Sequence, residues 1–193
     1  MNRKQDDTMS LRYRIVLSGS GGQGVITAAI ILAEAAVIYE KRNAVQTQVY
    51  GAAARGGATR SDVIISDATI NYPKVDQPNI LVCLTQEAYA KFSAIIRPGG
   101  TLITDPRFVT PVKKVDATQY ELAMYEAVMY QIGKPIVFNV CMMGALVGLT
   151  GVVGLGAVEN VLEQRLPPAF MDMNRQALQL GYDLGAAQQA GQA

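Results

Sequence analysis

One short segment near the start of the chain constrains the fold more than any other feature. Residues 14–18 (RIVLS) are rich in β-branched side chains and predict a buried strand, and the glycine-rich sequence GSGGQG follows at once. Residues 23–39 are then apolar nearly all round, which predicts a helix buried on more than one side. A buried strand that turns through glycines into a buried helix is the opening unit of a layered α/β fold.

The rest of the chain continues this alternation. We predict further strands at residues 44–49, 61–66, 79–84, 100–104 and 111–116. We predict further helices at residues 86–96, 119–130, 139–149, 158–166 and 174–187. Because strands alternate with helices, the fold class is α/β, a three-layer α/β/α arrangement with a mostly parallel, Rossmann-like sheet. The 193 residues suffice for a single domain, which we place at residues 13–187 between flexible tails at 1–12 and 188–193.

An uncharged stretch at residues 135–158 is long enough to suggest a membrane span. Glycines crowd its second half, and neither aromatic belts nor basic clusters flank it. We therefore predict a buried helix whose small residues Gly144, Ala145 and Gly148 let another backbone approach closely, as at a subunit interface. The polar N-terminus lacks the apolar stretch of a secretory signal, so we expect a cytoplasmic protein that binds no membrane.

Composition excludes several kinds of chemistry. The chain has no histidine, so it cannot by itself build a Ser-His-Asp or Cys-His nucleophile or a histidine-ligated metal site. Its two cysteines, Cys83 and Cys141, lie far apart in apolar runs and can assemble neither an iron–sulfur cluster nor a zinc site. A net charge of +1 with acids and bases interspersed gives no electrostatic footprint for nucleic acid.

The glycine-rich stretch also predicts a phosphate-binding turn. Gly19, Gly21 and Gly24 fit the G-x-G-x-x-G spacing between a strand and a helix, where backbone N–H groups and the helix dipole converge on an anion. Tight turning and close helix–sheet packing without any ligand would explain the same glycines. A dinucleotide-dependent enzyme needs an acid at the end of the second strand, and residues 48–51 (QVYG) offer none. Simple NAD chemistry is therefore disfavoured.

A second loop of small residues follows the second predicted strand. Residues 50–57 (YGAAARGG) hold one charged side chain, Arg55, at the edge of the sheet where ligands usually bind in parallel α/β folds. A guanidinium flanked by glycines can bind a carboxylate or a phosphate together with neighbouring backbone N–H groups. The alternative is a turn in which Arg55 only pairs with a nearby acid.

Several segments in order resemble one family. These are residues 19–28 (GSGGQGVITA), 50–57 (YGAAARGG), 61–67 (SDVIISD), and a pair of prolines followed by 171–185 (MDMNRQALQLGYDLG). Together they resemble the gamma subunit of the 2-oxoacid:ferredoxin oxidoreductases over nearly the whole chain. One position departs from the pattern, because Ala53 stands where many relatives have a glutamate. A role of that carboxylate therefore does not carry over to this chain.

The resemblance implies an enzyme assembled from several chains. Such complexes decarboxylate a 2-oxoacid on thiamine diphosphate with Mg²⁺, pass electrons through iron–sulfur clusters to ferredoxin, and form an acyl–coenzyme A. The implied partners are alpha and beta subunits, with a ferredoxin-like delta subunit as a further candidate, and the gamma chain helps to shape the coenzyme A side. The resemblance gives this chain no catalytic residue. The expected cofactor-binding residues are Gly19, Gly21, Gly22, Gln23, Gly24, Tyr50, Arg55, Gly56 and Gly57.

Two other functions stay open from the residues alone. One is an independent nucleotide-binding oxidoreductase, and the other is a purely structural interaction module. The oxoacid is also open among pyruvate, 2-oxoglutarate and branched-chain acids such as ketoisovalerate, with 2-oxoglutarate favoured. We expect the isolated chain to be inactive and to associate with itself, since its apolar faces exceed what one monomer needs to cover its sheet.

Overall fold

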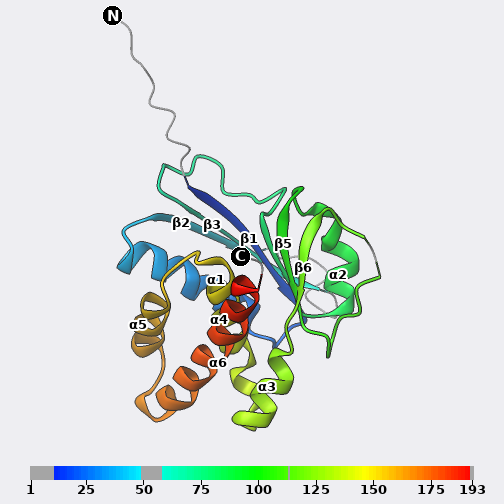
Figure 1. Cartoon of the computed structure of the whole chain (residues 1–193). Helices are drawn as coiled ribbons and strands as arrows, with labels where there is room; N and C mark the ends of the chain where they lie inside the picture. The colour runs from blue at the N-terminus through cyan, green and yellow to red at the C-terminus, as the bar shows by residue number, and fades with distance from the viewer. Residues whose placement is uncertain (1–10, 49–57, 113, 192–193) are drawn as a thin grey trace, which may run out of the picture.

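The structure, a computed structural model, describes residues 11–48, 58–112 and 114–191 and is built around one twisted sheet (Figure 1). The sheet contains six strands in the order β2-β3-β1-β4-β5-β6. Their bounds are β1 Arg12–Gly19, β2 Asn43–Gln48, β3 Thr59–Ser66, β4 Ile80–Cys83, β5 Gly100–Thr104 and β6 Ala117–Glu121. Strands β1, β4, β5 and β6 pair in parallel, whereas β3 runs antiparallel to both of its neighbours. The predicted α/β class with a mostly parallel sheet is confirmed.

Helices cover both faces of this sheet. On one face lie α1 (Val25–Glu34), α4 (Phe138–Thr150), α5 (Leu155–Arg165) and α6 (Met171–Ala190), and on the other lies α2 (Gln86–Phe92) (Figure 1). Successive side chains along β1 point to opposite faces of the sheet and therefore pack against different helices. Ile15 and Leu17 belong to the core beneath α1, whereas Val16 belongs to the core beneath α2. Helix α3 (Met124–Gln131) follows the last strand.

The elements differ from prediction in one region. The described residues of the strand expected at 111–116, which are 111–112 and 114–116, form no strand, and the first residues of the helix expected at 119–130 instead form the end of β6. Strand β6 pairs with β5 from Gly100 and Ala117 to Thr104 and Glu121. An outermost strand needs backbone pairing on one side only, so β6 forms without the apolar run that marks the four inner strands β3, β1, β4 and β5. The helix then begins at Met124.

The uncharged stretch forms α4, a helix buried on all sides. Placing a Cβ on Gly144 or Gly148 would bring it 2.1 Å from the Leu178 carbonyl oxygen or 2.2 Å from the Tyr182 carbonyl oxygen. Placing one on Gly181 of α6 would bring it 1.8 Å from a carbonyl oxygen of α4. The close-packed backbone is therefore α6 of the same chain, which corrects the expectation of a subunit interface at these residues.

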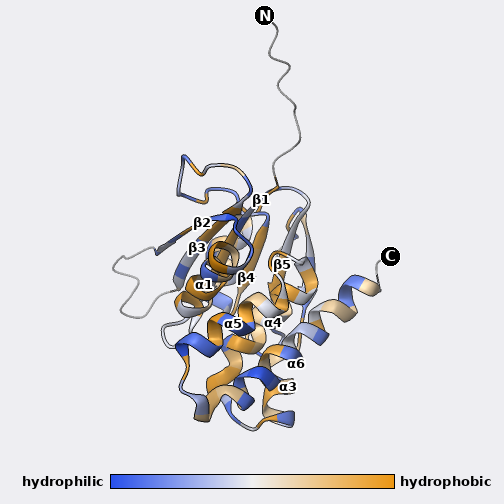
Figure 2. Ribbon diagram, turned by 90° about the vertical axis from the view of Figure 1, so that its left-hand side faces the viewer, coloured by the Kyte–Doolittle hydropathy of each residue, from blue (hydrophilic) through white to orange (hydrophobic). Residues whose placement is uncertain are grey.

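Hydropathy along the helices follows this arrangement. In Figure 2, α1 and α4 are hydrophobic over most of their length, whereas α5 and α6 also carry hydrophilic residues. Helix α4 is covered by other elements of the chain, which is why it needs no polar face. No helix in the described ranges is both long enough and apolar enough to cross a bilayer.

Candidate functional site

The glycine-rich turn lies at the carboxyl edge of the parallel strands. Strand β1 ends at Gly19, and its neighbours β4 and β5 end at Cys83 and Thr104 on the same edge. Gly19 pairs with Thr59 at the start of the antiparallel strand β3. The turn therefore lies at the same edge as the ends of β4 and β5, where α/β folds usually bind ligands.

Gln23 gives the turn its shape. Its side-chain oxygen accepts a hydrogen bond from the Ser20 backbone N–H at 2.7 Å, and its side-chain nitrogen donates to the Leu84 carbonyl at 3.2 Å. The first bond closes the turn and the second ties it to the end of β4. The same side chain lies so close to Gly19 that a Cβ there would be 2.4 Å from the Gln23 Oε1. Gln23 therefore acts as a positioning residue for the glycine turn.

The other glycines of the turn divide into two groups. Gly24 has φ +71°, and a Cβ on it would lie 2.6 Å from the Asn139 side-chain nitrogen, so packing alone requires glycine there. Gly22 has φ +89°, and a Cβ built on Gly22 or on Gly21 would meet nothing within 4 Å. Helix α1, which begins after Gly24, has neither a side-chain cap nor an acid in its first turn. Its first backbone N–H groups are therefore available to an anion.

A hollow of about 340 Å³ lies beside the turn. Gly22, Gln23 and Gly24 form one wall, and Asn139 and Ile136 contribute to the opposite side. Its apolar side is a cluster of three aromatic rings that pack edge to face, with ring centroids 5.1–5.8 Å apart. The rings belong to Phe108, Tyr125 and Phe138. A neighbouring hollow of about 630 Å³ shares the Tyr125 ring and adds Asp105, Arg107 and Glu126. The turn thus opens onto a surface with both aromatic and charged groups.

Asp105, which the sequence analysis did not single out, lies fully buried at the end of β5. Its two carboxylate oxygens accept hydrogen bonds from the backbone N–H groups of Arg107 and Tyr125, each at 2.8 Å. Burial raises the pKa of this carboxyl, and the backbone donors oppose the rise. Asp105 therefore holds the loop after β5 to the start of α3, where Tyr125 lies. Its position directly after the predicted strand at 100–104 was the sequence feature that could have identified it as a candidate site residue.

Burial also determines the state of the two cysteines. Cys83 and Cys141 are fully buried, and desolvation raises the pKa of each thiol to about 12. Over residues 11–48, 58–112 and 114–191, no cluster of three or more metal-ligating side chains was found. These residues do not fit an iron–sulfur cluster, which needs accessible thiolates in one place.

The structure describes only part of the predicted set. It brings together Gly19, Gly21, Gly22, Gln23 and Gly24 around one turn. The remaining predicted residues lie outside the described part of the chain: Tyr50, Arg55, Gly56 and Gly57. The described residues that flank this segment are placed at the same edge as Gly19, because β2 ends at Gln48 and β3 begins at Thr59.

Comparison with known proteins gives a consistent result. A family model described as pyruvate ferredoxin/flavodoxin oxidoreductase matches residues 14–184. The 2-oxoglutarate synthase subunit KorC of Methanocaldococcus jannaschii is 41% identical over 95% of this chain and 98% of its own length. The KorC subunit of Methanothermobacter marburgensis is 40% identical over 90% of this chain and 97% of its own length.

Solved structures have the same fold. The gamma subunit of a keto/oxoacid ferredoxin oxidoreductase from Geobacter sulfurreducens has a TM-score of 0.82 and 42% identity, covering 91% of this chain and 99% of that one. A 2-oxoglutarate:ferredoxin oxidoreductase from Magnetococcus marinus has the same TM-score at 20% identity, with 91% of this chain matching 31% of that chain. This second likeness concerns the fold alone.

Proposed function

The chain belongs to the pyruvate ferredoxin/flavodoxin oxidoreductase family as a gamma-type subunit, and from this we propose that it forms the coenzyme A side of a 2-oxoglutarate:ferredoxin oxidoreductase. The glycine turn carries the proposal. It presents an uncapped helix start beside an aromatic hollow at the carboxyl edge of the sheet. Coenzyme A combines phosphate groups with a long neutral arm, and such a surface suits both parts.

The choice of 2-oxoglutarate rests on the relatives that match this chain along most of both lengths. Those with 39–41% identity are named as subunits of 2-oxoglutarate synthases. A pyruvate synthase subunit, PorC, is 28% identical. In this proposal the complex converts 2-oxoglutarate and coenzyme A to succinyl–coenzyme A and carbon dioxide, with two electrons leaving to ferredoxin.

Other chains of the complex supply the redox chemistry. Thiamine diphosphate with Mg²⁺ activates the oxoacid, and iron–sulfur clusters carry the electrons. The proposed partners are an alpha and a beta subunit, with a ferredoxin-like delta subunit as a further candidate. Exposed apolar side chains support a partner, because Ile136, which borders the 340 Å³ hollow beside the turn, is 79% exposed, and Tyr130 of α3 is 90% exposed.

Arg55 provides the test of the coenzyme A side. In the intact complex, Arg55→Ala should raise the KM for coenzyme A by a factor of about 10 to 150, since a charge-assisted hydrogen bond to a partly buried anion is lost. Arg55→Lys should recover part of this loss, because an ammonium cannot reproduce the planar two-pronged contact. Steady-state kinetics at varied coenzyme A gives the constant, and gel filtration verifies that the complex remains assembled.

Arg175→Gln is the matched control. Arg175 is an exposed arginine of α6 that already pairs with Glu159 and Glu163, so its loss should leave the KM for coenzyme A unchanged. An unchanged constant in Arg55→Ala would remove this loop from the site. A purely structural module predicts that outcome, with assembly or stability affected instead.

The choice of enzyme and the role of other chains need separate measurements. The purified chain alone should not oxidise any 2-oxoacid with a viologen acceptor, and thiamine-dependent turnover by it would contradict the subunit assignment. The assembled complex should have a higher kcat/KM for 2-oxoglutarate than for pyruvate or 2-oxoisovalerate. A preference for pyruvate or 2-oxoisovalerate would replace 2-oxoglutarate as the proposed substrate and would leave the family assignment unchanged.

A further inference from the structure

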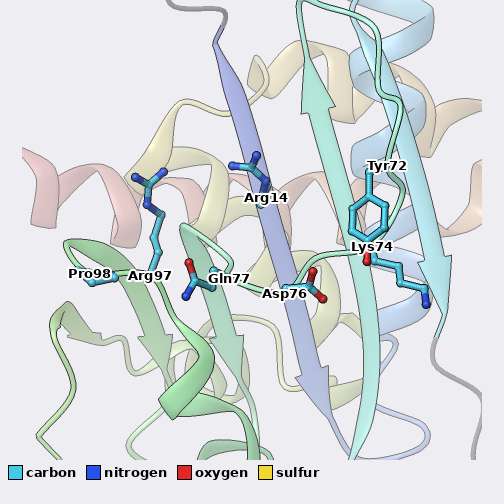
Figure 3. A pocket seen from close by; sticks show the side chains of 7 residues that line it. All are labelled: Arg14, Tyr72, Lys74, Asp76, Gln77, Arg97 and Pro98. Carbon is cyan, nitrogen blue, oxygen red and sulfur yellow. The ribbon is translucent and has the colours of Figure 1, made fainter.

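A third hollow lies at the edge of the sheet opposite to the glycine turn. Its volume is about 660 Å³, and it is formed where β1 and β4 begin (Figure 3). We call it the basic hollow, and its lining includes Arg14, Tyr72, Lys74, Asp76, Gln77 and Arg97. These residues come from β1, from the segment before β4 and from the segment before β5. No function discussed so far uses this hollow.

Backbone hydrogen bonds hold the three segments of the basic hollow together. The Arg14 backbone N–H donates to the Asn79 side-chain oxygen at 2.6 Å, and the Asn79 N–H donates to the Arg14 carbonyl at 2.9 Å. The Arg97 backbone N–H donates to the Pro78 carbonyl at 2.9 Å. The two arginines are therefore fixed to the same segment, residues 72–79, by backbone contacts rather than by their charged ends.

The charges of the basic hollow are unbalanced. Three cationic side chains, from Arg14, Lys74 and Arg97, line it with a single carboxylate, Asp76. Figure 3 shows the guanidinium groups of Arg14 and Arg97 on the same side of the strands. Within the described part of the chain, none of the three cations forms an ion pair.

Most of the other described arginines form ion pairs. Four of them pair with carboxylates at 3 Å or less: Arg42, Arg60, Arg165 and Arg175. One further arginine beside the basic hollow also lacks full pairing. The Nε of Arg12 is buried and has no partner in the described residues, while its Nη2 is 3.5 Å from the Tyr72 carbonyl. Among the described arginines that form no ion pair, Arg12, Arg14 and Arg97 lie together here, whereas Arg107 lines the hollow of about 630 Å³ beside the glycine turn.

We propose that the basic hollow binds a small molecule that carries phosphate groups. Guanidinium groups form paired hydrogen bonds with phosphate oxygens, and the Lys74 ammonium adds a mobile third cation. The Gln77 amide offers an uncharged donor between them. Tyr72 is 53% exposed at the rim, where its ring can stack on a base or another planar group. A volume of about 660 Å³ is in the range of small-molecule sites.

This site is separate from the proposed coenzyme A surface. The glycine turn lies at the carboxyl ends of the parallel strands, whereas Arg14 lies near the start of β1 and Arg97 precedes β5. Substitutions in the basic hollow therefore test it without touching the turn. The proposal does not depend on the proposed function, and either can fail alone.

Calorimetry on the full-length chain at low ionic strength tests the site, with pyrophosphate and ADP as probes. Both should bind, and Arg97→Gln should weaken binding of pyrophosphate by about tenfold. The double variant Arg14→Gln/Arg97→Gln should abolish measurable binding of pyrophosphate. Tyr72→Ala distinguishes the two sources of phosphate, because it should weaken ADP alone if the natural ligand is a nucleotide and neither probe if it is an inorganic phosphate.

Arg175→Gln is again the matched control, because it removes the same charge from the other face of the sheet. It should change the affinity for pyrophosphate by less than twofold. The proposal is overturned if the wild-type chain binds neither probe, if Arg97→Gln binds as the wild type does, or if Arg175→Gln loses as much affinity. Should Arg14→Gln fail to fold, Lys74→Gln combined with Arg97→Gln replaces it, since both side chains are exposed.

Discussion

The contact between α4 and α6 makes Gly181 the most sensitive position of the fold to a single added methyl group. In Gly181→Ala, the new Cβ would lie 1.8 Å from the Cys141 carbonyl oxygen and 2.9 Å from the Ala145 backbone nitrogen. Both obstacles are helix backbone, so a change of rotamer cannot relieve the clash. The two helices must separate, and the packing along their whole contact is disturbed.

The magnitude follows from two opposing effects. Alanine favours a helix over glycine by about 1 kcal/mol, which alone would stabilise α6. Overpacking a well-filled core typically costs about 1–3 kcal/mol, and a clash with backbone falls at or above the top of that range. We therefore expect Gly181→Ala to lower the free energy of unfolding by about 2 kcal/mol or more. For a domain of this size that corresponds to a fall of roughly 4–8 °C in Tm.

Thermal and urea unfolding followed by circular dichroism measures this effect. Gly156→Ala is the matched control, because Gly156 also lies in a helix, α5, and a Cβ there would meet nothing within 4 Å. This control should be as stable as the wild type or more stable by up to about 1 kcal/mol. If Gly181→Ala unfolds at or above the wild-type temperature, the helices are not packed backbone to backbone and the reasoning is refuted.

Three further predictions concern buried polar and titratable groups. Cys83 and Cys141, whose thiol pKa values burial raises to about 12, should not react with Ellman's reagent at pH 8 in the native chain, and both should react in urea. Asp62→Ala should lower the free energy of unfolding in urea by about 3 kcal/mol, because it leaves the half-buried Arg60 without its 2.6 Å partner. Burial raises the pKa of Asp105, so the native chain binds this proton more tightly than the unfolded chain, and stability is lost as pH rises above about 4. Urea unfolding between about pH 4 and 7 should therefore show a less negative slope of stability against pH in Asp105→Asn than in the wild type.

Each of these has a result that contradicts it. Rapid labelling of either thiol in the native chain would mean that the core around it opens easily. The double variant Arg60→Met/Asp62→Leu should recover most of the stability lost in Asp62→Ala, and failure to do so would assign the loss to packing rather than to the unpaired charge. Parallel pH profiles of the Asp105→Asn variant and the wild type would show that Asp105 titrates alike in the folded and unfolded chain.

The fold was predictable wherever burial requires a recognisable pattern of apolar residues in the sequence. Five of the six strands and the buried helix α4 coincide with apolar runs or with glycine and proline boundaries. Strand β6 was missed because an outermost strand can be polar, and residues 117–121 carry no such run. The small residues of α4 correctly indicated a close-packed backbone. The pattern does not tell whether that backbone comes from the same chain, since Gly181 and Gly185 lie far along the sequence.

The candidate site was predictable only where it is local. The spacing of residues 19–24 identifies the turn, because strand, glycines and helix follow one another directly. Asp105 and the aromatic rings beside the turn were not found, since they come from segments more than 80 residues away and meet it only after the sheet has formed. The basic hollow was missed for the same reason, because Arg14 and Arg97 come together only when β4 pairs with β1 on one side and with β5 on the other.

The geometry of the turn decides how its glycines should be interpreted in mutagenesis. Alanine at Gly19 or Gly24 would meet the Gln23 or Asn139 side chain at 2.4–2.6 Å, so a loss of coenzyme A binding in either variant reports damaged packing. Gly22 has open space but a positive φ, and a substitution there strains the backbone. Gly21 has neither constraint, since its surroundings are open and its φ is not in the left-handed region. Among these four glycines, only Gly21 can accept a methyl group without a steric clash or an unfavourable φ. The effect of Gly21→Ala on coenzyme A affinity therefore tests whether the turn binds the ligand with the least disturbance of the protein.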